Sequence, residues 1–445
     1  MPVSPARAAA FDILLRVERE SSYASELLHS KTYTALSTQD HALATELVMG
    51  VLRWRSRLDD EIATASSQSL AKLDLEVLLA VRLALYQFRW LDRIPKRAAL
   101  NESVELVKRA RKRSAAAFVN AVLRKLASKK APAETKITTA QALAHEVAHP
   151  EWLVDRWVRR YGLEAAIEIC KYDQSKPETA IRLRSTTAEA ELVQHGVELL
   201  GGRILSSART ARGDIPRTKA LRERGFVIQD EGSQLVAALV GKDLQTRILD
   251  CCAAPGGKTL AIADRNRQSR VTAVEFHPHR ARLLRNLVRT ATPDNAIQII
   301  VADARQLPTP GIFDRVIADV PCSGTGTLAR NPEIKWRLTT EDLADLHSRQ
   351  AAILRSAMSQ VAVGGHVIYS TCSLEKEENE DVIEEVLANN AGFHVVDCRQ
   401  ELNRLRSAGE LLLPDVVPLT SGPYLCTIPG IHPCDGFFAA ILGKE

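Results

Sequence analysis

The sequence lacks the patterns that mark disulfide-stapled, zinc-stapled, membrane-spanning or disordered chains. Its eight cysteines form no Cys-x-x-Cys pair and are irregularly spaced, which predicts neither a disulfide framework nor a zinc module. No apolar run approaches the roughly 18 residues of a membrane span, and residues 1–5 lack a signal-peptide pattern. Hydrophobic residues make up 45% and charged residues 25%, as in globular proteins. We therefore expect a soluble, cytoplasmic protein with free thiols and no membrane partner.

The positive charge of the chain is concentrated near its N-terminus. The 445 residues are enough for several domains of roughly 150 residues each, and their net charge is +5. Residues 1–150 hold 23 Lys+Arg against 16 Asp+Glu, residues 151–235 hold 14 against 13, and residues 236–445 hold 22 against 25. This asymmetry is typical of a polyanion-binding domain attached to a more neutral one, although a solvated helix surface is the alternative.

The N-terminal part of the chain has the pattern of a helical bundle. Between residue 6 and about residue 130, apolar side chains recur at spacings of three and four, as in Phe11-x-x-Leu14-Leu15-x-Val17. The densest cationic stretch is Lys108-Arg109-Ala110-Arg111-Lys112-Arg113. It could neutralise RNA phosphates or simply form an exposed helix end. We expect an all-α RNA-binding domain over residues 1–145.

The next segment, residues 146–235, has a mixed pattern. Linker helices precede a strand-like stretch over 179–184, a helix is expected over 187–200, and a second strand-like stretch covers 226–228. Such alternation suits a small α+β module that could face RNA.

From residue 236 to residue 445, strands and helices alternate. The expected strands are Thr246–Cys251, Arg270–Glu275, Ala296–Ala302, Phe313–Asp319 and Gly365–Thr371, and the expected helices are 258–265, 277–290 and 341–361. Continuous runs of Val, Ile and Leu in the strands indicate a parallel sheet covered on both faces. This predicts a Rossmann-like, doubly wound α/β domain, whose ligands lie at the carboxyl ends of the strands.

The first strand of this domain leads into a turn of small residues. The turn and the residues after it read Cys252, Ala253, Ala254, Pro255, Gly256, Gly257 and Lys258. A P-loop would need glycine where Cys252 stands, and no G-x-G-x-x-G can be aligned. The following strands end at or just before Glu275 and Asp303, where acids can bind a ribose and an adenine amino group. The pattern favours an adenosyl-type cofactor without a pyrophosphate.

Two cysteines follow neighbouring strands of the same sheet. The segments are Asp319-Val320-Pro321-Cys322-Ser323-Gly324-Thr325-Gly326 and Tyr369-Ser370-Thr371-Cys372-Ser373. A thiolate that adds to carbon 6 of a pyrimidine makes carbon 5 nucleophilic enough to accept a methyl group. Lys258 could favour the thiolate, and Asp319 could hold the cytosine amino group and ring nitrogen.

With these motifs assembled, the chain closely resembles bacterial ribosomal RNA cytosine carbon-5 methyltransferases with an N-terminal NusB-like domain, the RsmB/Sun/Fmu type. The resemblance covers essentially the whole chain and is most specific over residues 253–259, 319–326 and 371–373. It implies S-adenosyl-L-methionine as cofactor, cradled by residues 252–258, with Glu275 on the ribose and with Asp303 and Asp319 completing the site.

The resemblance also assigns catalytic roles and a substrate. It implies that Cys372 is the nucleophile, that Cys322 assists release of the methylated RNA, and that Lys258 is the active-site lysine. It makes residues 176–235 an RNA-binding module and residues 229–234 the motif beside the cofactor. The implied partner is small-subunit (16S) ribosomal RNA, free or partly assembled, with no obligate protein partner.

Two other classes of function stay open from the sequence. A methyltransferase acting on an exocyclic amine would need no cysteine nucleophile, and an RNA-binding assembly factor would need no chemistry. The candidate metal ligands His277, His279, His432 and Cys434 have no recognised metal spacing, so we expect no metal.

Overall fold

The computed structural model describes residues 3–30, 32–33, 35–130, 136–213, 215, 221, 225–291, 297–307 and 312–445. The chain divides into two compact units. The first comprises Met1–Lys176 and Leu328–Arg337, and the second comprises Pro177–Thr327 and Leu338–Glu445. The helices of residues 146–176 therefore group with the N-terminal bundle, whereas the small α+β module groups with the large C-terminal sheet.

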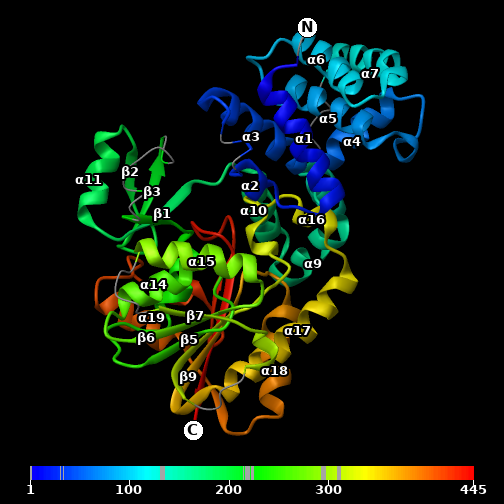
Figure 1. Cartoon of the computed structure of the whole chain (residues 1–445). Coiled ribbons are helices and arrows are strands. Elements are labelled where there is room, and N and C mark those ends of the chain that lie inside the picture. Colours follow the sequence, from blue (N-terminus) through cyan, green and yellow to red (C-terminus); the bar gives the residue numbers. More distant parts are fainter. Residues whose placement is uncertain are drawn as a thin grey trace. The chain divides into compact units, whose positions relative to one another are not determined.

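The first unit is helical throughout its described residues, as expected for a NusB-like bundle (Figure 1). Its α-helices are α1 (Pro5–Glu20), α2 (Ala24–Leu28), α3 (Thr38–Arg53), α4 (Arg55–Ala65), α5 (Leu75–Trp90), α6 (Lys96–Arg109), α7 (Ala116–Ser128), α8 (Ala140–Glu146), α9 (Glu151–Tyr161), α10 (Leu163–Gln174) and α16 (Ile334–Arg337). Among the helices of the described segments, none combines the length and apolarity needed to cross a membrane.

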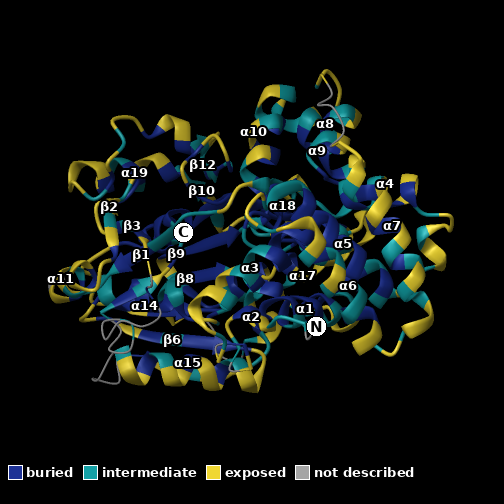
Figure 2. Ribbon diagram, turned by 90° about the horizontal axis from the view of Figure 1, so that it is seen from above, coloured by how far each residue is buried: buried dark blue, intermediate teal, exposed yellow. Residues whose placement is uncertain are grey.

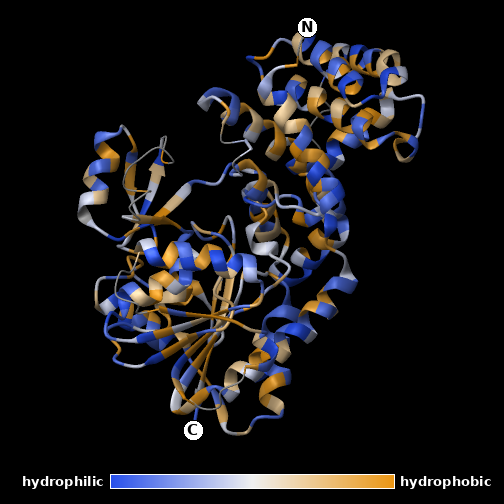
Figure 3. Cartoon of the chain, viewed as in Figure 1, coloured by the Kyte–Doolittle hydropathy of each residue, from blue (hydrophilic) through white to orange (hydrophobic). Residues whose placement is uncertain are grey.

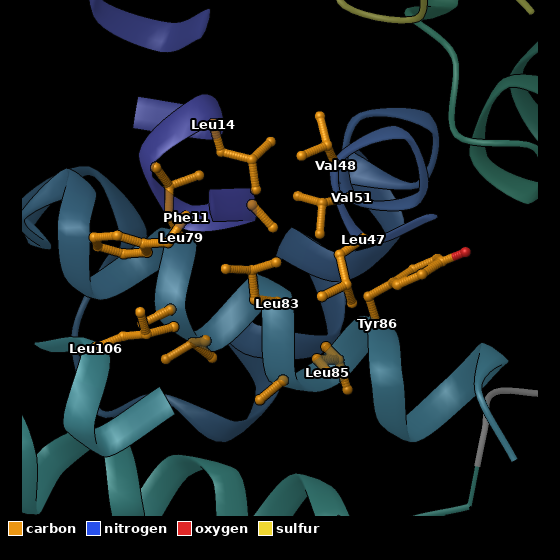
Figure 4. Packing of buried hydrophobic residues seen from close by; sticks show 14 of the residues in the cluster. Phe11, Leu14, Leu47, Val48, Val51, Leu79, Leu83, Leu85, Tyr86 and Leu106 are labelled. Carbon is orange, nitrogen blue, oxygen red and sulfur yellow. The ribbon is translucent and has the colours of Figure 1, made fainter. Parts of the chain in front are cut away.

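The core of the bundle forms where the apolar stripes of α1, α3 and α5 meet (Figure 4). Leu14, Leu47 and Leu83 each expose 1% or less of their surface. Burying one such side chain contributes about 1.5–3 kcal/mol to stability. Because residues three and four apart lie on one face of a helix, this burial leaves the apolar spacing from which these helices were predicted.

A segment from the C-terminal half of the sequence, Leu328–Arg337, completes this first unit. The Lys335 ammonium is fully buried and donates to the Arg53 carbonyl at 3.1 Å, and the Trp336 indole donates to the Leu52 carbonyl at 2.5 Å. The Arg53 guanidinium donates in turn to the Ala329 carbonyl at 2.9 Å. Sequence patterns missed this insertion because its partners are 276 or more residues away along the chain.

The second unit begins with the small α+β module. Its antiparallel sheet has the order β2-β3-β1-β4. The elements are β1 (Thr179–Leu183), α11 (Thr186–Gln194), β2 (Glu198–Gly201), β3 (Ala208–Arg212) and β4 (Phe226–Ile228). The helix expected over 187–200 was wrong at its end, because residues 198–201 pair with β3 instead.

The main sheet has nine strands, with the order β11-β12-β13-β9-β8-β5-β6-β7, and β10 also pairs with β13. Its strands are β5 (Arg247–Asp250), β6 (Arg270–Glu275), β7 (Ile297–Val301), β8 (Phe313–Asp319), β9 (Val361–Thr371), β10 (Phe393–Val396), β11 (Thr420–Ser421), β12 (Tyr424–Thr427) and β13 (Phe437–Lys444). Strands β5 to β9 are parallel, as expected, and β12 and β13 pair antiparallel. Ala296, the expected start of β7, lies outside the described residues.

Helices cover both faces of the main sheet, and this explains the continuous apolar strands. The helices of this unit are α13 (Glu231–Ala238), α14 (Gly257–Arg265), α15 (Pro278–Ala291), α17 (Thr340–Ser359), α18 (Glu380–Ala388) and α19 (Cys398–Ser407). Ile317 packs into a cluster with α13 and α14, whereas its neighbour Val316 packs into one with α17. Both faces of the central strands are therefore buried and apolar (Figures 2 and 3).

An ion-pair bridge joins the small module to the main sheet. Asp264 on α14 accepts hydrogen bonds from Arg182 at 2.7 Å and from Arg184 at 2.7 and 2.8 Å. Burial opposes the charge of Asp264, but the two guanidinium groups outweigh it and hold its pKa below the usual value. The module is thus fixed beside the helix that follows the small-residue turn.

Replacing Gly50 by alanine should destabilise the first unit, although the same change in an exposed helix stabilises it by about 1 kcal/mol. A Cβ at Gly50 would lie 1.9 Å from Cζ of Tyr86. That ring is stacked on Trp90 with centroids 5.2 Å apart. We expect Gly50→Ala to lower the free energy of unfolding by about 2 kcal/mol in urea titrations followed by tryptophan fluorescence. In a Tyr86→Leu background the loss should disappear, and an equal loss in both backgrounds would contradict the explanation.

Candidate active site

The site begins at the turn between β5 and α14. Gly256 has φ +112°, and a Cβ there would lie 2.6 Å from Leu284 Cδ1. Asp250, to which sequence reasoning gave no role, accepts hydrogen bonds from the Thr259 hydroxyl at 2.7 Å and from the Cys252 N–H at 3.3 Å. Burial raises the pKa of Asp250 to about 6. The turn is therefore held by a buried acid and made from residues small enough for a ligand to approach.

The expected cofactor residues lie along this edge of the sheet. Residues 252–256 form the turn, and Gly257 and Lys258 begin α14. The side chain of Gln229 lies near the turn, because a Cβ on Gly257 would be 3.6 Å from its Cδ. Asp230 caps α13, and the buried Glu231 carboxylate accepts three backbone N–H groups from residues 203–205. The motif over 229–234 thus ties the small module to the small-residue turn after β5.

The two acids predicted to contact the cofactor have different environments. One Glu275 oxygen, Oε1, accepts the His277 N–H at 2.8 Å, and Oε2 has no hydrogen-bond partner among the residues described. Asp303 caps a short 3₁₀ turn and holds Arg305 in a bidentate ion pair. Hydrogen bonds from Arg305 lower the pKa of Asp303. Glu275 therefore has an acceptor free for a ribose, whereas Asp303 is engaged by a neighbouring side chain.

The two predicted cysteines are in direct contact. Sγ of Cys322 lies 3.3 Å from Sγ of Cys372, and the Cys372 N–H also points to the Cys322 sulfur at 3.3 Å. Both thiols are free and half-buried. The hydrogen bond with Cys372, reinforced by burial, raises the pKa of Cys322 well above its usual value. Both the hydrogen bond and burial therefore favour the protonated form of Cys322.

A half-buried ion pair lies beside the thiols. The Lys258 ammonium donates to Asp319 Oδ2 at 2.7 Å and lies 5.0 Å from the ring centre of Phe437. The Ser370 hydroxyl donates to Asp319 Oδ1 at 2.8 Å. Burial would lower the pKa of Lys258, but Asp319 and the charge of Cys372 outweigh burial and raise it. Lys258 is thus a cation that interacts with both an acid and a thiol. The sequence analysis had not predicted that Ser370 and Phe437 belong to the site.

The candidate metal ligands of the sequence have other partners or lie apart from any cluster. His432 accepts the Ile428 N–H at 2.8 Å and contacts the Pro418 carbonyl, so it holds a loop. His277 and His279 lie beside each other with ring centres 5.5 Å apart. Within the described ranges, no group of three or more His, Cys, Asp or Glu side chains could hold a metal ion.

Comparison with known proteins identifies relatives over the whole length of the chain. A family described as 16S rRNA methyltransferase RsmB/F matches residues 236–443, and the NusB family matches residues 4–128. The probable ribosomal RNA small subunit methyltransferase B of Bacillus subtilis is 33% identical over 462 residues, covering 100% of both chains. The protein of the same name from Synechocystis is 31% identical and covers 99% of both chains.

Solved structures share the fold. The crystal structure of PH0851 superposes with a TM-score of 0.83 at 22% identity and covers 100% of both chains. NSun6 from Pyrococcus horikoshii, solved with SFG, gives a TM-score of 0.56 at 18% identity, covering 66% of this chain and 98% of that one. These likenesses confirm the expected fold class, and the sequence relatives confirm the resemblance. The chain belongs to the RsmB/F family of 16S ribosomal RNA methyltransferases.

Proposed function

We propose that this protein methylates carbon 5 of a cytosine in small-subunit ribosomal RNA through a covalent adduct with Cys372. The observation that carries the proposal is the contact of the two thiols at 3.3 Å beside the Lys258–Asp319 pair. Methylation of an exocyclic amine would need neither thiol, and an RNA-binding assembly factor would need no half-buried lysine facing a thiol.

S-adenosyl-L-methionine is the methyl donor of this family, and the residues present fit it. The turn over 252–257 is built from small residues, and Glu275 Oε2 is available to a ribose hydroxyl. When bound, the cofactor supplies an electrophilic methyl group. We propose that Glu275, Asp303 and the turn hold it at the carboxyl edge of the sheet.

The chemistry we propose starts at Cys372. Its sulfur forms a bond to carbon 6 of cytosine, and the displaced π electrons make carbon 5 the nucleophile that takes the methyl group. Lys258 offsets the negative charge that develops on the ring, and Asp319 can accept a hydrogen bond from the cytosine amino group. Loss of the carbon 5 proton then returns electrons to the ring and expels the sulfur.

The electrostatics support separate roles for the two thiols. Lys258 interacts with the charge of Cys372, whereas Cys322 is held as a neutral thiol. Once Cys372 is bonded to carbon 6, the hydrogen bond that most raises the pKa of Cys322 is lost. We propose that Cys322 then gives its own proton to solvent, and that the resulting thiolate accepts the carbon 5 proton.

Exposed arginines on α15 support contact with RNA in the catalytic unit. This helix follows Glu275, carries no acidic residue, and exposes Arg282, Arg285 and Arg289, for which the described part of the chain supplies no ion-pair partner. Its Arg280 donates to the Ala254 carbonyl in the cofactor turn at 3.3 Å. We propose that these free cations neutralise RNA phosphates next to the site.

Replacing the two cysteines one at a time should separate their roles. Cys372→Ala should abolish both methyl transfer and the covalent RNA adduct, because no thiolate remains to attack carbon 6. Cys322→Ala should retain adduct formation and accumulate the adduct on denaturing gels, because release is blocked. Methylation surviving in Cys372→Ala would favour an exocyclic-amine reaction. Mapping of 5-methylcytosine in ribosomal RNA with and without the protein would locate the substrate.

Removing the cation should make Cys372 less reactive. In Lys258→Gln, we expect iodoacetamide to alkylate Cys372 about tenfold more slowly at about pH 7.5, since about 1.4 kcal/mol of thiolate stabilisation is lost. Peptide mass spectrometry distinguishes Cys372 from Cys322. Lys242→Gln, which removes a lysine paired with Glu410 elsewhere in this unit, serves as the control and should leave the rate unchanged.

Charge reversal on α15 should weaken RNA binding. We expect Arg282→Glu with Arg285→Glu to lower affinity at least tenfold at low salt and to reduce the salt slope of log K by about 2. The matched control is Arg267→Glu with Arg270→Glu, which reverses two exposed charges at the amino end of β6. Equal loss in both double variants would indicate a general charge effect and no specific surface.

A further inference from the structure

A buried carboxylate lies directly behind the two catalytic loops. Glu378 ends the 3₁₀ turn Lys376–Glu378 that follows β9, and its side chain is fully buried. Its Oε1 accepts the Ser323 N–H and the Gln350 amide, each at 2.8 Å. Its Oε2 accepts the hydroxyls of Ser323 and Ser373. One carboxylate thus accepts four hydrogen bonds.

The two serines are the residues that immediately follow the two cysteines. Ser323 follows Cys322, and Ser373 follows Cys372. Their hydroxyls also contact each other at 3.0 Å. Glu378 therefore links both cysteine loops at positions one residue from the sulfur-bearing side chains.

Glu378 differs from most buried acids in having, among the described residues, only neutral hydrogen-bond donors around its carboxylate. No lysine, arginine or histidine of the described chain pairs with it, so its four donors are all neutral groups. Burying a carboxylate without a counter-ion costs several kcal/mol unless its oxygens are fully hydrogen-bonded. The four hydrogen bonds offset this desolvation free energy only while both cysteine loops stay in this arrangement.

The two loops depend on Glu378 to different degrees. The Cys372 loop has other anchors, because the Asn379 amide donates to the Ser373 carbonyl at 2.9 Å and the Ser373 N–H reaches the Thr371 hydroxyl at 3.2 Å. At Ser323, both the N–H and the hydroxyl end on Glu378, apart from the contact with Ser373. The Gln350 amide also reaches the Pro321 carbonyl at 2.9 Å, on the other side of Cys322. Loss of Glu378 would nevertheless remove the N–H and hydroxyl acceptor of Ser323, whereas Ser373 would keep its bonds to Asn379 and Thr371, so we expect the larger effect at Cys322.

We propose that Glu378 is a positioning residue that holds Cys322 against Cys372. Glu378 thereby supports release of the methylated RNA more than formation of the adduct. The inference rests on the proposed function, because it concerns the second half of the same reaction. Glu378 touches neither thiol and acts through Ser323 and Ser373.

The test measures adduct formation and adduct release separately. With single-turnover kinetics on cytosine-containing ribosomal RNA, we expect Glu378→Ala to form the adduct within threefold of the parent rate and to release it at least tenfold more slowly. Glu378→Gln, whose amide can still link both serines, should recover most of the release rate. Glu384→Gln, the same substitution at an exposed position of α18, is the control and should match the parent.

Each outcome bears on the inference. Unchanged release in Glu378→Ala, or equal slowing of both steps, overturns it. If Glu378→Ala does not fold, Ser323→Ala replaces it, and this variant should slow release more than formation. Absence of any adduct in the parent protein would instead refute the proposed function, so the two failures are distinguishable.

Discussion

The parallel pairing of β8 with β9 is the constraint on which the rest of the site depends. Its register pairs Asp319 with Ser370, so the loops that follow the two strands leave the sheet at the same point. Cys322 and Cys372 are 50 residues apart in sequence, yet their sulfur atoms lie 3.3 Å apart. The same pairing brings the Ser370 hydroxyl to Asp319 and the two serines to Glu378. Without this register, neither the thiol pair nor its polar support would exist.

Burial makes the electrostatics of this edge effective. A cation shared between an acid and a thiol would be screened at a surface, but in a low-dielectric site it interacts strongly with both. Lys258 meets this condition because α14 begins immediately after the turn that follows β5. Cys322, whose pKa is raised, and Cys372, which interacts with Lys258, therefore have different electrostatic surroundings although their sulfur atoms are in contact. That difference gives a physical basis for a division of labour between two chemically identical side chains.

The cations without an acidic partner are not distributed as the net charge of each sequence segment suggested. In the densest cationic stretch, Lys108, Arg109 and Lys112 are each paired with an acid at 2.7–3.1 Å. The catalytic segment is slightly acidic overall, yet its helix α15 exposes three arginines for which the described residues supply no acidic partner. Net charge per segment therefore located the basic domain, but the cations available to a polyanion follow from which acids lie within reach in space.

The sequence alone predicted most elements, and it singled out the residues that we propose to react. Strands β6 and β8 lie where the apolar runs predicted them, because burial on both faces leaves a continuous local pattern. Residues 198–201 and 328–337 escaped prediction, since pairing with β3 and packing in the helical unit are set by distant partners. Only the tertiary structure decided how far apart the two sulfurs lie, which thiol faces Lys258, and that Glu378 lies beneath both loops. These are contacts between residues separated in sequence, and such contacts leave no local signal.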